Sequence, residues 1–195
     1  GGVSNLTYFD GENIIGFDVG PGNGLMDTYV QSYFNLPFDN QGNLARSGKI
    51  NHEFLKKFEN DSFFKTSYPK SIDRLHFQKT YHEILKENLS PFDILATLLE
   101  FSISSIKISI GQLPKLPKNL LIVGGGQHNK FLIERLKKVL DLRIYTSKDF
   151  NFSGDMIEAE LIAFIAIRSL KNMPYTFPTT TGVKQASSGG KIYKF

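Results

Sequence analysis

The 195-residue sequence contains no cysteine and no tryptophan. The absence of cysteine excludes a disulfide scaffold, thiolate metal sites and a cysteine nucleophile. No apolar run approaches the roughly 20 residues that span a bilayer, and the first residues lack the basic and apolar segments of a signal peptide. The sequence therefore predicts a chain with no membrane partner.

An initiator methionine is also absent, and the chain opens on Gly1-Gly2, a pair that normally follows a strand. We therefore expect a chain cut from a longer one. Its length is that of one large domain or one lobe of a larger protein. Hydrophobic residues make up 41% of the sequence, which is enough to fill a core.

The charge balance is slightly basic, with a net charge of +4. Lysines are scattered through amphipathic segments, as at Lys56, Lys57, Lys137 and Lys138, which is typical of solvated helix faces. No stretch interleaves basic and aromatic residues in the way of a nucleic-acid groove, so we expect no nucleic-acid partner.

The first half of the chain predicts a β-hairpin followed by helices. Alternating polarity on both sides of the turn signal Asp10-Gly11 indicates the hairpin, and apolar residues at helical spacing follow it. Two segments without periodicity are expected to be loops. The expected elements are strands at 4–9 and 14–19, helices at 25–33 and 50–58, and loops at 35–50 and 61–74.

The second half alternates strands and helices. Ser90, Pro91 and Asp93 form a helix start. The serine is the N-cap, the proline lies in the first turn, and the aspartate is the third helical residue. The expected elements are a helix from Pro91 that ends before Gly111, a buried strand at 119–123, a helix carrying Leu132, Leu136 and Leu140, a strand at 143–146, a helix at 155–170 packed on the sheet, and one short strand within 178–195. This order predicts an α/β domain with a mixed β-sheet flanked by helices.

The triplet Gly124-Gly125-Gly126 joins the strand at 119–123 to the next helix. Such a bend lets the backbone approach a ligand, and the following helix N-terminus favours an anion or a nucleotide. A tight turn is the alternative, although three glycines cost conformational entropy that a turn does not require. The triplet is neither a P-loop nor Gly-x-Gly-x-x-Gly. His128 and Asn129 are placed to cap the helix or to touch a ribose.

A second bend, Gly20-Pro21-Gly22-Asn23, follows Asp18 at the end of the second hairpin strand. An acid beside exposed backbone N–H groups can hold Mg²⁺ while the loop cradles a phosphate. Asp27 lies one turn into the next helix. The alternative is an aspartate that only orders the turn, but a second glycine-rich strand end in one domain favours a ligand site.

Two further segments carry candidate residues. Asp155 and Glu158 lie three residues apart at a helix start, where they form either a capping box or an acidic face directed into a cleft. Lys70 and Arg74 belong to the loop at 61–74, where a cation can bind a carboxylate or phosphate. A solvated loop is the alternative for that segment.

Six segments follow one another along the chain: Gly1-Gly2-Val3-Ser4-Asn5, Phe17-Asp18-Val19-Gly20-Pro21-Gly22-Asn23, Ala45-Arg46-Ser47-Gly48-Lys49-Ile50-Asn51, Pro69-Lys70-Ser71, Gly124-Gly125-Gly126-Gln127-His128-Asn129 and Asp155-Met156-Ile157-Glu158-Ala159. In this order they resemble motifs of the anhydro-N-acetylmuramic acid kinase family, and Met26-Asp27 and Thr181-Gly182 fit as well. The matches span essentially the whole chain, and six in sequence are more specific than any one. The chain therefore resembles the C-terminal half of that family.

The resemblance implies an actin-like ATPase fold, with two lobes of ribonuclease H type and ATP between them. Residues 1–195 would form the C-terminal lobe, with the N-terminal lobe as its missing partner. The family uses ATP and Mg²⁺ to open the 1,6-anhydro ring of anhydro-N-acetylmuramic acid with water while it phosphorylates O6. This reaction serves peptidoglycan recycling in the bacterial cytoplasm. A homodimer is compatible with the sequence.

The resemblance also implies roles for individual residues. Around the phosphates and Mg²⁺ it places Gly1, Gly2, Asp18, Gly20 and Asn23, with Asp18 as the metal ligand. Around the adenosine it places Gly124, Gly125, Gly126 and Asn129. On the sugar side it places Glu158 and Lys70. The general base is expected in the N-terminal lobe, so no catalytic residue is assigned to this chain.

The sequence also departs from the family pattern. The family's first phosphate loop and the segment with its proposed aspartate base have no counterpart here, and Tyr68 and Ile72-Asp73 replace family residues around Lys70. Phosphoryl transfer needs charge stabilisation from both sides of the phosphate. The sequence therefore predicts weak nucleotide binding and negligible turnover for this chain alone.

Two other functions stay open on sequence grounds. One is a non-catalytic actin-like module that binds a nucleotide or a partner protein. The other is a dinucleotide-binding domain, which needs an acid at the end of the strand after the glycine bend. There the segment Tyr145-Thr146-Ser147-Lys148-Asp149 offers only Asp149, at a marginal position.

Overall fold

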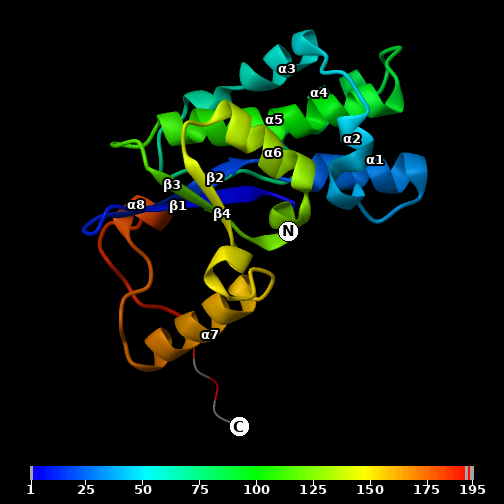
Figure 1. Cartoon of the computed structure of the whole chain (residues 1–195). Helices are drawn as coiled ribbons and strands as arrows, with labels where there is room; N and C mark the ends of the chain where they lie inside the picture. The colour runs from blue at the N-terminus through cyan, green and yellow to red at the C-terminus, as the bar shows by residue number, and fades with distance from the viewer. Residues whose placement is uncertain (1, 192, 194–195) are drawn as a thin grey trace.

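The computed structural model describes residues 2–191 and 193 (Figure 1). The strands are β1 (Ser4–Phe9), β2 (Ile14–Gly20), β3 (Asn119–Ile122) and β4 (Arg143–Thr146). The α-helices are α1 (Gly24–Phe34), α2 (Asn43–Arg46), α3 (His52–Glu59), α4 (Gln78–Ile84), α5 (Pro91–Gly111), α6 (Lys130–Val139), α7 (Ile157–Leu170) and α8 (Pro178–Thr181). Short 3-10 helices are η1 (Asn40–Gly42), η2 (Ser62–Lys65), η3 (Gly124–His128) and η4 (Ser147–Phe150).

The predicted hairpin is confirmed. β1 and β2 pair antiparallel, and the Asp10 carboxylate closes the turn by accepting hydrogen bonds from the backbone N–H groups of Glu12 and Asn13. Alternate residues of the two strands face inward, and Tyr8, Ile15 and Phe17 form a small cluster with Leu113. The hairpin therefore delivers Asp18 and Gly20 to one fixed end of β2.

The second half contains a strand–helix–strand unit, as predicted. β3 and β4 pair in parallel, with α6 as the crossover between them. The single mixed sheet predicted from the sequence is wrong for the described residues, where the strands form two separate two-stranded sheets. No strand hydrogen bonds join the hairpin to β3 in that part of the chain; instead α5 contacts both β2 and α6.

Helix α5 is the centre of the core. Ser90 caps it by accepting from the Asp93 N–H, and Pro91 occupies its first turn, as predicted. The Phe101 ring stacks on Phe58 of α3, with ring centroids 4.3 Å apart. Among the described residues, α5 alone is long and apolar enough to cross a membrane by length and composition. Because 67% of its apolar window is buried inside the molecule, it is accounted for as a core helix. The sequence analysis did not identify α5 as a possible membrane span because polar residues interrupt its apolar run.

Helix α7 differs from its prediction. It forms close to the expected bounds, but none of its described residues is buried, so the predicted packing on a sheet is wrong. Figure 1 shows α3 to α6 on one side of the strands and α7 projecting on the other. The tail turns back toward the hairpin, where Thr179 of α8 donates to the Ile14 carbonyl and Thr180 lies against Gly16.

Several short elements were not predicted. The expected loop at 35–50 contains η1 and α2, and α4 follows the expected loop at 61–74. In the tail, the expected strand is reduced to a single bridge between Thr176 and Ser187. The lysines expected on solvated faces, such as Lys56 and Lys137, are exposed.

Candidate functional site

The bend after β2 is fixed by its neighbours. The Asp18 N–H donates to the Lys70 carbonyl at 3.0 Å, and Oδ2 of Asp18 accepts from the Ile72 N–H at 2.8 Å. From the core side, the Ser102 hydroxyl of α5 donates to the Gly22 carbonyl at 2.5 Å. These contacts hold the turn in one shape, with Asp18 at its root.

The bend is packed too tightly for larger residues. A Cβ atom on Gly20 would lie 2.7 Å from Oγ of Ser105, and one on Gly24 would lie 2.4 Å from the Gly2 carbonyl oxygen. Gly2 therefore lies against the first turn of α1, next to the bend at Gly20–Asn23. The family resemblance places Gly2 and that bend together around the phosphates. Gly1, which was grouped with them, lies outside the described residues.

The second bend is built differently. Gly124 has a left-handed backbone, with φ of 65°, and its N–H donates to the Gly154 carbonyl at 3.1 Å. A Cβ on Gly124 would meet nothing within 4 Å, and one on Gly126 would come no closer than 3.8 Å to another atom, Cγ2 of Ile122. Internal packing therefore does not require glycine at these positions, and the backbone faces open space.

The two bends lie side by side. The nearest atom to a Cβ built on Gly125 would be Nδ2 of Asn23, at 3.7 Å. Asn23 belongs to the first bend and Gly125 to the second, and about a hundred residues of sequence separate them. A ligand that contacts the backbone of Gly125 would therefore reach the Asn23 side chain as well.

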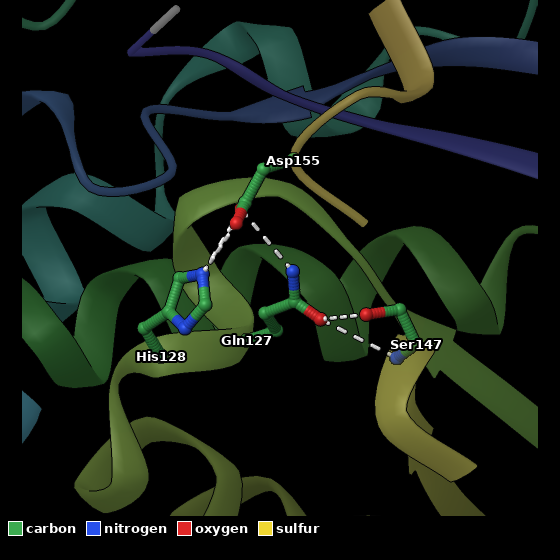
Figure 2. A network of polar contacts seen from close by, with 4 residues as sticks. All are labelled: Gln127, His128, Ser147 and Asp155. Atoms are coloured by element: carbon green, nitrogen blue, oxygen red, sulfur yellow. Dashed lines mark hydrogen bonds and ion pairs between the residues drawn. The ribbon is translucent and has the colours of Figure 1, made fainter. Parts of the chain in front are cut away.

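A polar network supports the second bend, with Gln127 and Ser147 buried and His128 and Asp155 exposed (Figure 2). Oε1 of Gln127 accepts from the Ser147 hydroxyl at 2.6 Å, and Nε2 of Gln127 donates to Asp155 at 3.3 Å. Nε2 of His128 lies 2.9 Å from the same carboxylate. Gly154 makes room for this arrangement, because a Cβ there would lie 2.4 Å from Nε2 of Gln127.

This network shows the role of Asp155. The sequence analysis offered a helix cap as one possible role for this residue. Met156 is the cap residue of α7 and makes no side-chain capping bond, so the capping box is absent. The hydrogen bond from His128 is the main cause that lowers the pKa of Asp155 below its usual value. Asp155 therefore ties the start of α7 to the glycine bend. No sequence pattern indicated the roles of Gln127 and Ser147.

Asn129 caps α6, which was one of its two expected roles. Its Oδ1 accepts from the Leu132 N–H at 3.0 Å, and its side chain is buried against Gly42. Its Oδ1 is therefore engaged by the helix. The adenosine role stays a prediction.

Lys70, expected on the sugar side, has its side chain directed into the molecule. Its ammonium group is buried and donates to the Phe63 carbonyl at 3.1 Å and to Oε1 of Gln112 at 3.0 Å. Burial lowers the pKa of this amine. The amine fastens the loop at 61–74 to the core. The role of Lys70 on the sugar side stays a prediction.

Asp27 is the most perturbed acid near the bends. It lies half-buried in the first turn of α1, and burial, followed by repulsion from Asp39, raises its pKa to about 6. Asp39 is itself engaged, since its two carboxylate oxygens accept from the Leu44 and Ala45 N–H groups. The Asp27 side chain makes no hydrogen bond to the described residues. Its raised pKa marks it as a functional candidate.

Glu158 lies in the first turn of α7 and is exposed, so it does not point into a cleft formed by the described residues. No cluster of three or more His, Cys, Asp or Glu side chains exists within residues 2–191 and 193. A metal held by Asp18 would therefore need water or ligand phosphate for most of its coordination, which suits Mg²⁺. Oδ1 of Asp18, which accepts no hydrogen bond from the described residues, is the available oxygen.

The fold and the bends define an α/β protein with a backbone-lined site, a class that includes many proteins that bind phosphate-containing ligands. Comparison with known proteins gives the family. The family model described as anhydro-N-acetylmuramic acid kinase matches residues 1–195. The chain belongs to that family.

Individual relatives agree with this assignment. The anhydro-N-acetylmuramic acid kinase of Rhizobium rhizogenes is 36% identical over 193 residues, which cover 98% of this chain and 51% of the relative. The protein of the same name from Pseudomonas syringae pv. tomato is 38% identical over 198 residues, covering 99% of this chain and 54% of the relative. The chain thus spans about half the length of these relatives, and it corresponds to their C-terminal half.

Proposed function

We propose that this chain is the nucleotide-binding wall of an ATP-dependent kinase for 1,6-anhydro-N-acetylmuramic acid. The observation that carries the proposal is the closeness of the two bends, since a Cβ built on Gly125 would lie 3.7 Å from Nδ2 of Asn23. Glycines that neither packing nor backbone angle requires, at Gly125 and Gly126, are explained by a ligand that needs the space. The family assignment makes ATP the ligand to test.

In this proposal the residues divide as the family resemblance implies. Gly2, Gly20 and Asn23 present the first bend to the phosphates, together with Gly1. Gly124, Gly125 and Gly126 present the second bend to the adenosine, with Asn129 beside them. Glu158, in the first turn of α7, serves the sugar side.

Mg²⁺ and ATP fit the residues that are present. Mg²⁺ keeps several waters and binds through one or two carboxylates and the substrate phosphates. Asp18 offers one free carboxylate oxygen at the root of the first bend. When bound, the metal would neutralise charge on the phosphates, while the chain's own contribution is to position them with backbone N–H groups.

The fold proposed for the whole protein is actin-like, with two lobes and the substrates between them. This chain supplies one wall, and the general base belongs to the other half. Alone, the chain would leave the phosphates open to water and without a base at hydrogen-bond distance. In the complete kinase the reaction would open the anhydro ring and phosphorylate O6, in peptidoglycan recycling in the bacterial cytoplasm.

Isothermal titration with Mg-ATP tests the nucleotide site. We expect weak binding by the chain and an affinity at least roughly tenfold lower in Gly125→Ala, equivalent to about 1.4 kcal/mol. Gly111→Ala is the matched control, since a Cβ at Gly111 meets nothing within 4 Å and Gly111 lies at the end of α5, outside both bends. Equal binding by the two variants, or no binding by the unmodified chain, would contradict the proposal.

A further inference from the structure

A small hollow lies beside the bend that follows β2. Its volume is about 30 Å³, which is the share of one water molecule in the liquid, so it admits a single small group and not a sugar ring. Its walls come from segments that are distant in the sequence. The lining residues include Gly2, Pro21, Gly24, Thr28, Arg74 and Gln78. The last two bring side-chain hydrogen-bond donors to the bend proposed for the phosphates.

Arg74 has no partner within the described part of the chain. It is exposed, and its guanidinium makes no hydrogen bond or ion pair with another described residue. Other arginines are engaged, since Arg46 pairs with Glu134 and Arg135 pairs with Glu100. A guanidinium carries five N–H donors in a fixed fork that matches the oxygens of a phosphate. At Arg74 these donors are available to a ligand.

The backbone that carries Arg74 is fixed on both sides. Before it, the Ile72 N–H donates to Oδ2 of Asp18 at 2.8 Å, which ties the segment to the root of the first bend. After it, the Phe77 side chain is buried, with its ring centroid 4.9 Å from that of Phe101 in α5. A ligand would therefore have to order only the side chain of Arg74, which keeps the entropic cost of binding low.

The polar groups of the hollow favour an anion. The Thr28 hydroxyl is engaged, because it donates to the Gly24 carbonyl at 2.8 Å. Gln78 is half-buried, and its side-chain amide makes no hydrogen bond to the described residues. No acidic side chain of the described residues lines the hollow. The available donors are therefore one cation and one amide, which together suit anionic oxygens.

The position of the hollow indicates which anionic group would reach it. Its lining includes residues of the first bend but none of the second bend. Asn23 is the residue of the first bend that lies near Gly125, whereas its neighbour Gly24 lines the hollow. A nucleotide whose adenosine lies at the second bend would therefore pass Asn23 before it reaches the hollow. The group that arrives there is the one most distant from the adenosine.

We propose that Arg74, with Gln78 beside it, binds the terminal phosphoryl group of the nucleotide. This inference rests on the proposed function, which assigns the adenosine and the phosphates to the two bends but gives Arg74 no role. A two-point contact from the guanidinium would hold the terminal oxygens in one orientation and offset their charge.

Isothermal titration with two nucleotides tests the inference on the chain as it is. The Mg²⁺ complexes of a non-hydrolysable ATP analogue and of ADP are titrated into the unmodified chain, Arg74→Gln and Arg143→Gln. Arg143 is the matched control, because it is an exposed arginine of β4 whose side chain also makes no hydrogen bond to the described residues. We expect Arg74→Gln to weaken binding of the ATP analogue at least roughly tenfold and binding of ADP less than roughly threefold. Arg143→Gln should change neither.

The outcomes separate this inference from the proposed function. Unchanged binding of the analogue by Arg74→Gln, an equal loss for both nucleotides, or an equal loss in Arg143→Gln would overturn the inference and leave the proposed function standing. No binding of either nucleotide by the unmodified chain would overturn both. The ³¹P NMR spectrum of the bound analogue gives a second readout, in which the γ-phosphate signal should differ between the unmodified chain and Arg74→Gln while the α-phosphate signal stays. A γ-phosphate signal that is the same in both proteins would also overturn the inference.

Discussion

Some glycines of this chain are required by close packing, and others lie where a larger side chain would fit. At Gly154 a Cβ would lie 2.4 Å from Nε2 of Gln127 and 2.8 Å from Oγ of Ser147, whereas at Gly125 the closest atom would be 3.7 Å away. The first position is demanded by packing, and the second is not. In the sequence Gly125 belongs to a glycine triplet and Gly154 stands alone, but neither pattern shows which position packing requires; only the structure distinguishes them.

Gly154→Ala is therefore predicted to destabilise the chain. The added methyl group would push apart the Gln127–Ser147 pair, and overpacking of this kind costs about 1–3 kcal/mol. Urea unfolding measures the loss, with Gly111→Ala as the control that should change the free energy of unfolding by less than about 1 kcal/mol. Equal midpoints for the two variants would show that the network does not constrain position 154.

Asp27 gives a prediction with a pH dependence. Its pKa is raised from 3.8 to about 6 in the folded chain. Above pH 6 the carboxylate is ionised in both states and its burial opposes folding; as the pH falls from 6 toward 4, only the folded state gains the proton, so stability rises. Asp27→Asn mimics the neutral form and should stabilise the chain at pH 8.

The gain expected from Asp27→Asn is roughly 1 kcal/mol, less than the full shift implies because solvent reaches part of the side chain. Denaturant unfolding at pH 8 and pH 4 measures it. The difference between variant and unmodified chain should be largest at pH 8 and should shrink toward pH 4. A difference that is the same at both pH values would contradict the assignment.

At the scale of elements, α5 and α6 are joined by an ion pair within the core. Arg135 of α6 makes a two-point contact with Glu100 of α5 at 2.9 and 3.0 Å, and the side chains are only 27% and 11% exposed. Its neighbour Glu134 makes a similar pair with Arg46, but there both side chains are more than 40% exposed. The two pairs share chemistry and differ in burial.

Arg135→Ala should destabilise the chain by roughly 3 kcal/mol, because it leaves Glu100 buried without its partner. Arg46→Ala is the matched control and should cost far less, since exposed pairs contribute little. Thermal unfolding of both variants measures the difference. Similar losses would mean that burial does not set the value of these pairs.

Most elements could be predicted from the sequence because their signals are local. The Ser90–Pro91 start of α5 and the Asp10-Gly11 turn depend on residues within a few positions, and both are confirmed. The helix α4 was missed because its seven residues are too short for a clear period. The prediction that α7 packs on a sheet was wrong. The apolar composition of α7 indicates burial, but it does not identify the element that would cover the helix.

At the scale of the whole molecule, the chain spans about half of its relatives, and catalysis by the proposed mechanism needs both halves. We expect no transfer of phosphate from Mg-ATP to anhydro-N-acetylmuramic acid by this chain above the no-enzyme rate. A coupled assay for ADP with the sugar present measures this. Clear turnover would mean that the residues of this chain suffice for catalysis. It would contradict the proposal that the chain supplies only one side of the active site.

The candidate site could be placed from the sequence only in outline. The two glycine-rich bends and Asp18 are recognisable as motifs, but their contact through Asn23 and Gly125 depends on the packing of β2, α1 and η3. The inward ammonium of Lys70 and the network around Gln127 could not be predicted, because each depends on partners dozens of residues away in the sequence. Motifs identified the candidates, and packing decided which of them face open space.

Backbone amide NMR, with Mg²⁺ and a non-hydrolysable ATP analogue as titrant, tests the convergence of the two bends most directly. The account predicts that the amide signals of Gly20 and Asn23 and those of Gly124, Gly125 and Gly126 all shift along one binding curve. Shifts confined to one bend, or two curves with different affinities, would contradict it.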